Sequence, residues 1–257
     1  AAPAPAQGVV RARIGDPTQG VHRLVPIMLP DPPHLFARRA ARLDALAAEH
    51  PMADWLRFMA TLARAQHAAV PRQRPSPVPD DALARARAAG APPLPAETSA
   101  RDSSWRDGLD EILAHVDTCL LPDAARAVVT VLGRRDADAL ERLATACLRA
   151  QVPAAEVGTA LFVVAALQVW FAAAAAALPA AALALLPRRG RCPVCGSAPV
   201  AGMIGASGPA GGARYLHCGL CATAWNHVRA VCIQCGEAKD LVLEAIGGGS
   251  GLVKGET

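Results

Sequence analysis

Residues 192–236 read CPVCGSAPVAGMIGASGPAGGARYLHCGLCATAWNHVRAVCIQCG, and they carry six of the eight cysteines as three C-x2-C pairs. The first two pairs are Cys192/Cys195 and Cys218/Cys221, separated by 22 residues. A C-x2-C turn places two sulfur atoms on one side of a tight loop, and two such turns on adjacent hairpins form a tetrahedral four-sulfur site. The spacing therefore predicts a small β ribbon that binds one metal ion through these four cysteines.

The third pair, Cys232/Cys235, predicts half of a second site. Its motif CIQCG matches CPVCG, and 22 residues follow Cys235, as 22 residues separate the first two pairs. If the unit repeats, a fourth pair would begin immediately after Thr257. The chain also begins at Ala1 and not at methionine, so we expect a fragment whose second ribbon lacks two ligands. The alternative is that Cys232 and Cys235 form a redox dithiol or a satellite of the first site.

The composition of the 257-residue chain indicates one large helical domain and a smaller module. Hydrophobic residues make up 53% of the chain, but aromatic residues make up only 4% and alanine supplies much of the rest. Such a composition suits helices that pack closely through small side chains. The net charge of +4 does not by itself support nucleic-acid binding.

We expect an α plus small-β architecture. Residues 1–30 contain scattered proline and glycine and are expected to be irregular, whereas residues 31–187 are expected to form an all-α domain. Within this domain, Asp80, Asp81 and Asp102 are interpreted as helix-start residues and not as acid or base catalysts.

The helical periodicity stops at Pro187-Arg188-Arg189-Gly190, where two ribbons are expected to begin. Residues 188–230 are predicted to form the first metal ribbon, and residues 231–257 the second, incomplete one. The strands are expected at 199–204, 214–217, 223–231 and 241–246, with a hairpin turn at 206–212.

Residues 160–178, ALFVVAALQVWFAAAAAAL, are long and apolar enough to cross a bilayer. Only Gln168 is strongly polar, but the second half is nearly all alanine, which inserts weakly, and no Lys or Arg flanks the N-terminal side. We therefore predict a buried central helix and no stable membrane insertion. The N-terminus lacks a secretion signal, and paired C-x2-C turns without one indicate a reducing compartment.

Glycine follows the second sulfur of two knuckles, at Gly196 and Gly236. Glycine tolerates a positive φ, which lets backbone N–H groups turn toward the thiolates. The middle knuckle departs from this pattern, because Ala222 follows Cys221 and its glycine, Gly219, lies between the cysteines.

Several polar and aromatic residues surround the second pair. His217 or His227 could act as a ligand, but the four sulfurs already complete the first site. Tyr215 and Trp225 are expected to cover the apolar side of the site, with contact to a partner protein as the alternative. Nearby arginines could offset the negative charge of four thiolates. The candidate partner contacts are Arg214, Tyr215, His217 and Trp225.

The spacing does not distinguish zinc from iron, because both accept tetrahedral thiolate sites. Iron would make the site redox-active, and zinc would make it structural. The sequence shows no phosphate loop, no GxSxG elbow and no HExxH helix, so we expect no enzyme activity. The isolated Cys119 and Cys147 are interpreted as small buried hydrophobic residues.

Two parts of the chain resemble the formate dehydrogenase accessory protein family, FdhE. They are CPVCGSAPVAGMI with RYLHCGLCATAWNHVRAVCIQCG, and LFARRAARLDALAAEHPMADWLRFMATLARAQ near the N-terminus. Generic zinc ribbons do not share the RYLHC and AWNHVR elements.

The resemblance implies a cytoplasmic maturation factor that associates with the catalytic subunit of respiratory formate dehydrogenase. It also implies a helical N-terminal domain followed by two rubredoxin-like modules, with iron as the metal. Carried onto this chain, Cys192, Cys195, Cys218 and Cys221 bind the first ion, and Cys232 with Cys235 provide half of the second site. The family's fourth C-x2-C pair is absent from this sequence.

Two other functions remain open. A rubredoxin-type electron carrier would need iron and a reversible potential, and a visible absorption band that bleaches on reduction would support it. A nucleic-acid-binding ribbon would need a clustered basic face with interleaved aromatic residues, and its binding would depend on salt.

Overall fold

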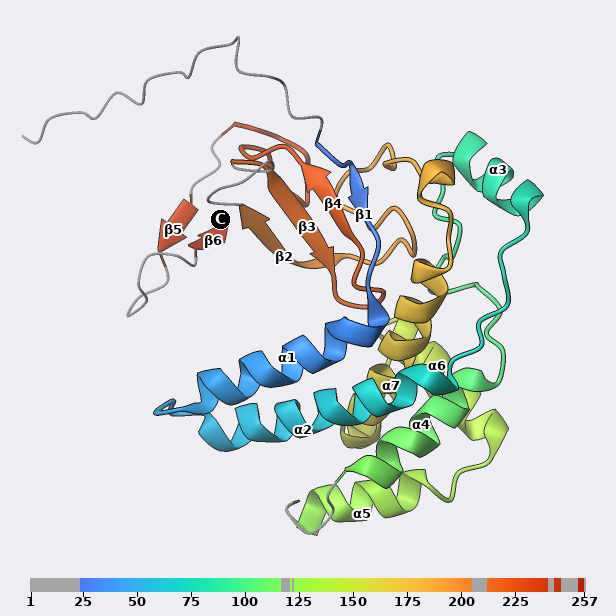
Figure 1. Ribbon diagram of the computed structural model, residues 1–257, viewed down its shortest axis with the longest axis vertical. Helices are drawn as coiled ribbons and strands as arrows, with labels where there is room; N and C mark the ends of the chain where they lie inside the picture. The colour runs from blue at the N-terminus through green and yellow to red at the C-terminus, as the bar shows by residue number, and fades with distance from the viewer. Residues whose placement is uncertain are drawn as a thin grey trace, which may run out of the picture.

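The computed structural model of the chain describes residues 24–116, 121, 123–204, 212–239, 243–245 and 254–256, the last two segments by their backbone alone. Helices make up the first part and a small antiparallel sheet the second, so the predicted fold class is confirmed (Figure 1). In chain order the elements are β1 (Ile27–Met28), α1 (Pro32–Ala47), α2 (Ala53–Ala69), α3 (Asp80–Ala88), α4 (Ser104–His115), α5 (Asp123–Leu132), α6 (Ala137–Leu148), α7 (Val157–Ala176), β2 (Pro199–Ile204), β3 (Arg214–Cys218), β4 (Ala224–His227), β5 (Leu243–Ala245) and β6 (Lys254–Glu256).

Helix α7 is the centre of the helical body. The segment Ala154–Ala176 has a mean hydropathy of 2.0, and 67% of its most apolar window is buried inside the protein. Helices α1, α2, α4, α5 and α6 all contact α7, and Phe162, Leu167 and Phe171 are among its fully buried side chains. A helix that is apolar on every side is expected at the centre of a bundle, and the prediction of a buried central helix is confirmed.

Asp102 connects three parts of the helical body. Its carboxylate accepts hydrogen bonds from the amide and the hydroxyl of Ser104, which begins α4, and from the amide of Ser76 in the proline-rich loop. It also accepts a bond of 3.3 Å from Nε1 of Trp170 in α7. Asp102 therefore satisfies an otherwise unpaired amide at the start of α4, as its interpretation as a helix-start residue requires.

We expect Asp102→Ala to lower the free energy of unfolding by about 2 kcal/mol at neutral pH, because buried donors lose their acceptor. Partial burial raises the pKa of Asp102, but hydrogen bonds from Ser104 outweigh it and hold the pKa below its usual value. The carboxylate thus stabilises the fold above the unfolded pKa, near 4, and this contribution is lost as the pH falls through the folded pKa. Urea titrations at several pH values measure the difference. The control is Asp107→Ala, which changes an exposed residue in the first turn of α4. Equal effects of the two substitutions on the free energy of unfolding would contradict the prediction.

The ribbon is a four-stranded antiparallel sheet in the order β1-β4-β3-β2. Strands β2 and β3 lie where the sequence predicted strands, whereas β4 ends at His227, before the turn that leads to the third cysteine pair. Strand β5 falls within the predicted 241–246 strand and pairs with β6. Most of the predicted hairpin turn, 206–211, lies outside the described residues.

Strand β1 shows that the expectation of an irregular segment over residues 1–30 is wrong at Ile27–Met28. Ile27 lies opposite Trp225 and Met28 opposite Ala224, so the start of the chain forms the edge of the ribbon sheet (Figure 1). The amide of Asn226 donates to the carbonyl of Pro26 at 2.9 Å. Three residues between prolines are too few to show strand periodicity, and their partner strand is about two hundred residues away in the sequence, so local patterns cannot reveal it.

Both cysteine knuckles of the first site are hydrogen-bonded to the helical body. The amide of Leu94 donates to the carbonyl of Val194, and the amide of Ala96 donates to that of Cys195, at 3.0 and 2.9 Å. On the other knuckle, Nε2 of Gln168 in α7 donates to the carbonyl of Gly219 at 2.8 Å. The ribbon is therefore attached to the helical domain at both cysteine turns, to the loop between α3 and α4 at one and to α7 at the other.

Candidate metal centre

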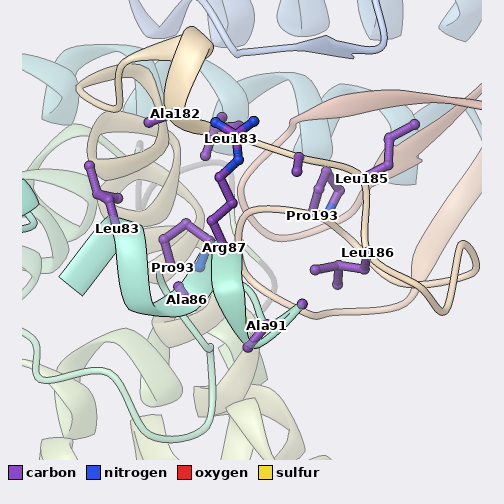
Figure 2. A pocket seen from close by; sticks show the side chains of 12 residues that line it. Leu83, Ala86, Arg87, Ala91, Pro93, Ala182, Leu183, Leu185, Leu186 and Pro193 are labelled. Carbon is purple, nitrogen blue, oxygen red and sulfur yellow. The ribbon is translucent and has the colours of Figure 1, made fainter. Parts of the chain in front are cut away.

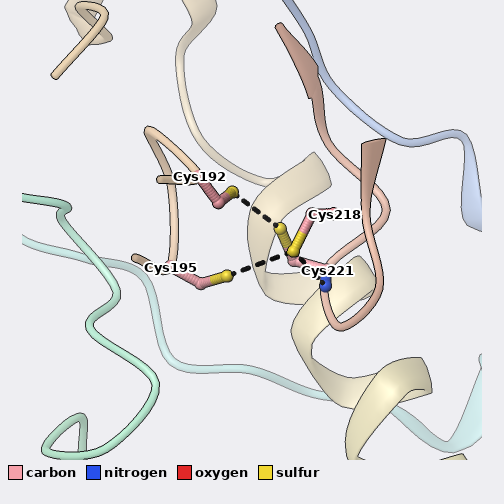
Figure 3. A group of neighbouring side chains, drawn as sticks. All are labelled: Cys192, Cys195, Cys218 and Cys221. Atoms are coloured by element: carbon pink, nitrogen blue, oxygen red, sulfur yellow. Dashed lines mark hydrogen bonds between the residues drawn. The ribbon is translucent and has the colours of Figure 1, made fainter. Parts of the chain in front are cut away.

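The four cysteines of the first two pairs meet in one buried cluster. Cys192 and Cys195 lie in the turn before β2, Cys218 ends β3, and Cys221 lies in the turn between β3 and β4. All four Sγ atoms lie within 4.8 Å of one another, and the pairs Cys192–Cys221 and Cys195–Cys218 are each 3.5 Å apart (Figure 3). The side chains come from two turns and point toward a common centre.

This geometry fits a tetrahedral ion. A metal–sulfur bond of about 2.3 Å places the sulfur atoms of a tetrahedral site roughly 3.8 Å apart. Two of the separations are 3.5 Å and none exceeds 4.8 Å, so the cluster is compatible with that value. The donor set is all sulfur and leaves no open position, as in structural zinc sites and in mononuclear iron sites.

The knuckle backbone is arranged around the sulfur atoms. In the first knuckle the amide of Cys192 donates to the carbonyl of Ser197, and the amide of Gly196 donates to the carbonyl of Cys192, both at 2.9 Å. Gly196 has a φ of 75°, as expected from its place after the second sulfur. In the second knuckle the amides of Leu220 and Cys221 point at Sγ of Cys218, each at 3.4 Å, so they can stabilise a thiolate.

Ala222 occupies the left-handed position that glycine takes in the other two knuckles, with a φ of 59°. A residue with a Cβ pays about 1–2 kcal/mol for this conformation. We expect Ala222→Gly to raise the free energy of unfolding of the metal-loaded protein by about 0.5–1 kcal/mol, the remainder being offset by glycine's greater unfolded-state entropy. Thermal unfolding measures the shift. Ala198→Gly, at an exposed site without a positive φ, should be neutral or destabilising, and a matching stabilisation there would contradict the explanation.

The four close sulfur atoms can all be ionised only if a cation lies among them. Burial raises the pKa of the Cys192 thiol, whereas hydrogen bonds from Cys192 and the other neighbouring thiols lower the pKa of Cys218. A divalent cation at the centre allows all four sulfurs to ionise, because it compensates their mutual repulsion.

The third pair has the same local turn but no complete ligand set. The amide of Cys232 donates to the carbonyl of Glu237 at 2.8 Å, the amide of Gly236 donates to the carbonyl of Cys232 at 3.0 Å, and Gly236 has a φ of 81°. Cys232 is half-buried and Cys235 is exposed. Among the residues that the structure describes, no further ligands gather around this pair, so a second metal site remains a prediction.

Three of the four candidate partner contacts are buried, as expected of side chains that cover the site. Arg214, Tyr215 and Trp225 are 4%, 6% and 0% exposed, and only His217 is half-buried. Tyr215 donates its hydroxyl to the carbonyl of Val25 at 2.8 Å, and Nε1 of Trp225 donates to the carbonyl of Arg189 at 2.8 Å. These side chains hold the ribbon together, and two of them do so through β1 and its flanking residues, which the sequence did not place here.

Arg214 also stabilises the ribbon from inside. Its Nη1 donates to the carbonyls of Arg229 and Val231, both at 3.2 Å, and so ties β3 to the chain that leads into the third pair. Neither His217 nor His227 belongs to the ligand group. Sequence reasoning missed the structural role of Gln168, although its position as the one strongly polar residue of an apolar helix was a signal.

Cys147, the isolated cysteine that the structure describes, is not part of the cluster. Burial raises the pKa of Cys147 to about 11, in keeping with its interpretation as an unreactive side chain. Cys119 lies outside the described residues.

A small pocket lies where α3 meets residues 182–186, near Pro93 and Pro193 (Figure 2). Its lining is apolar except for Arg87, whose Nη1 donates to the carbonyl of Ala181 at 3.3 Å. No second polar side chain is there to orient a ligand, so we interpret the pocket as a joint between α3 and the chain that enters the ribbon.

The fold and the cluster define an α-helical protein with a small β ribbon whose four-cysteine cluster could bind a metal ion. The family model described as FdhE, N-terminal, matches residues 24–187, and the one described as FdhE, central domain, matches residues 191–229. The chain belongs to the FdhE family.

Individual similar proteins lead to the same family assignment. A protein named FdhE homolog from Edwardsiella ictaluri is 39% identical over 241 residues, which cover 91% of this chain and 76% of the relative. Another from Cronobacter sakazakii is 38% identical over 220 residues, covering 84% of this chain and 70% of the relative. The crystal structure of the FdhE protein from Pseudomonas aeruginosa matches with a TM-score of 0.74 at 34% identity, over 87% of this chain and 76% of that one.

Proposed function

We propose that this chain is an accessory factor in the maturation of respiratory formate dehydrogenase, that it binds the catalytic subunit, and that it is not an enzyme. The observation that carries the proposal is membership of the FdhE family across residues 24–187 and 191–229. The resemblance seen in the sequence links this family to formate dehydrogenase. A reducing cytoplasm is the compartment in which unpaired thiols and such a site would persist.

The metal centre supports a scaffolding role. Cys192, Cys195, Cys218 and Cys221 would hold iron, with zinc as the alternative. A bound ion supplies folding free energy, and iron would in addition supply a one-electron redox couple. The four thiolates occupy every position of a tetrahedral ion, so substrate has no place to bind at the metal. The knuckles instead hold the ribbon against the helical domain, through Leu94 and Ala96 in the loop between α3 and α4 and through Gln168 in α7.

The domain plan that accompanies this function has three parts. Residues 31–187 form the helical domain, residues 188–230 the first rubredoxin-like ribbon, and residues 231–257 part of a second ribbon. Strand β1, within residues 1–30, belongs with the first ribbon because it pairs with β4.

The two alternative functions, nucleic-acid binding and electron transfer, differ in how well the described residues support them. A nucleic-acid-binding ribbon needs exposed aromatic side chains among basic ones, but Tyr215 and Trp225 are buried. An electron carrier is compatible with the four-sulfur cluster, and a visible band that bleaches on reduction without any bound dehydrogenase would favour it.

The test is recovery of the tagged protein from anaerobic cells, followed by analysis of bound metal and co-purifying proteins. We expect the catalytic subunit of formate dehydrogenase to co-purify with the tagged protein. We also expect one tightly bound metal ion in the first ribbon of each protein molecule. The Cys192→Ala/Cys195→Ala variant should lose both, and Cys147→Ala should keep both. Absence of any dehydrogenase subunit from the wild-type sample would refute the proposal.

A further inference from the structure

Strand β2 is an open edge of the ribbon sheet. It pairs with β3 on one side, and among the described residues no strand pairs with its other side (Figure 1). Five of its six residues are exposed, and Val200, Met203 and Ile204 are 74%, 60% and 44% exposed. The edge therefore presents unpaired backbone groups together with apolar side chains.

Nothing on β2 protects this edge along its length. Proteins usually block an exposed edge with a charged side chain, a proline or a bulge. Strand β2 reads PVAGMI, with no charge, and its proline and its register irregularity are both confined to the first positions, Pro199 to Ala201. From Ala201 to Ile204 the pairing with β3 is regular, so a second strand can align with those residues.

The opposite edge shows what kind of segment this sheet accepts. Strand β1 belongs to the stretch LVPIMLP, residues 24–30, which is apolar and uncharged. It adds to β4 from far away in the sequence, through the Ile27–Trp225 and Met28–Ala224 pairs. An uncharged apolar segment is therefore the type of strand that completes this sheet.

Two positively charged side chains lie near one end of strand β2. A hollow beside the start of β2 is lined by Arg188 and Arg191 together with Ala198, Pro199 and Gln234, and no carboxylate lines it. Both arginines are exposed, and neither forms an ion pair among the described residues. An incoming segment with an acidic residue at that end would meet complementary charge.

We propose that the free edge of β2 binds an extended segment of the partner protein by strand addition, and that this segment is apolar and uncharged along β2 with an acidic residue beside Arg188 and Arg191. The inference rests on the proposed function, so the partner is the catalytic subunit of formate dehydrogenase. Main-chain hydrogen bonds would supply affinity, and the arginines would set the direction of the added strand.

The experiment measures binding of the metal-loaded full chain to the purified catalytic subunit of the same organism's respiratory formate dehydrogenase. The variant Val200→Lys/Ile204→Lys places charges on the edge at exposed positions, so the fold should tolerate it. We expect it to weaken binding at least about tenfold, and Arg191→Glu to weaken binding about threefold to tenfold, less so at high salt. Met28→Lys makes the same kind of change on the opposite edge strand, at a residue 41% exposed, and should bind as the wild type does.

The outcomes separate the two proposals. Binding by wild type with equal binding by the double variant overturns strand addition at β2 and leaves the proposed function standing. Loss of a homodimer in the double variant with unchanged subunit binding also overturns it, because β2 would then pair with its own copy. Failure of the wild type to bind overturns the proposed function and this inference with it. Slower amide exchange at 200–204 in the wild-type complex, with unchanged exchange at 27–28, is the expected direct signature.

Discussion

Replacing Cys192 and Cys218 together by alanine is expected to abolish metal binding and to unfold the ribbon while leaving most of the helical body intact. The change removes one ligand from each knuckle, so neither turn can retain the ion alone. Structural four-coordinate sites contribute on the order of 10–16 kcal/mol of coupled binding and folding. A ribbon of this size buries too little apolar surface to replace that contribution.

Three measurements check this prediction. Elemental analysis should find no stoichiometric metal, near-ultraviolet circular dichroism should lose the signal of the buried Trp225, and far-ultraviolet circular dichroism should keep most of the helical signal. Cys147→Ala is the matched control, because it changes a cysteine outside the cluster. A double variant that held one ion and melted like the wild type would disprove the metal assignment.

Trp225→Ala is expected to lower the free energy of unfolding of the metal-loaded protein by about 3–5 kcal/mol, the range for a buried aromatic side chain. The indole is fully buried, lies opposite Ile27 of β1, and donates its N–H to the carbonyl of Arg189. The truncation would leave a cavity in the buried core and an unpaired carbonyl at Arg189, just before the first knuckle. Trp225→Phe should cost less, because it fills most of the cavity and loses mainly the hydrogen bond.

This prediction also distinguishes a structural tryptophan from a partner contact. Chemical denaturation of the two variants gives the stability change, and Val228→Ala is the control, since Val228 is 65% exposed close by in the chain. A contact residue would lose partner binding with little change in stability. If Trp225→Ala unfolded at the wild-type denaturant concentration yet failed to bind the catalytic subunit, the burial argument would be wrong.

The local parts of the structure could be predicted well from the sequence. Strand β2 and the left-handed glycines at 196 and 236 lie where expected, and α7 is the buried central helix. Each depends on residues close together in the chain: a turn residue after a sulfur, a short apolar run, or an apolar helix ended by proline.

The parts that failed depend on distant segments. The sequence predicts that Tyr215 and Trp225 cover the apolar side of the metal site, with partner contact as the alternative, but it does not indicate that Tyr215 bonds to Val25 or that Trp225 lies opposite Ile27. Gln168 was noted as polar, yet its bond to Gly219 joins residues that only the packing of the ribbon on α7 brings together. No local pattern encodes such pairings, because they arise from the packing of the whole chain.

The sequence by itself determined which atoms can bind the metal, since thiolate chemistry and the two-residue spacing within each pair act over a single turn. It also determined a helical body, through apolar periodicity and an alanine-rich composition. Only the tertiary structure decided which edge of the ribbon is open. Strand β1 pairs with β4, and no strand among the described residues pairs with the outer side of β2, because a sheet edge is covered by whichever extended segment packs against it, however far away in the chain that segment lies.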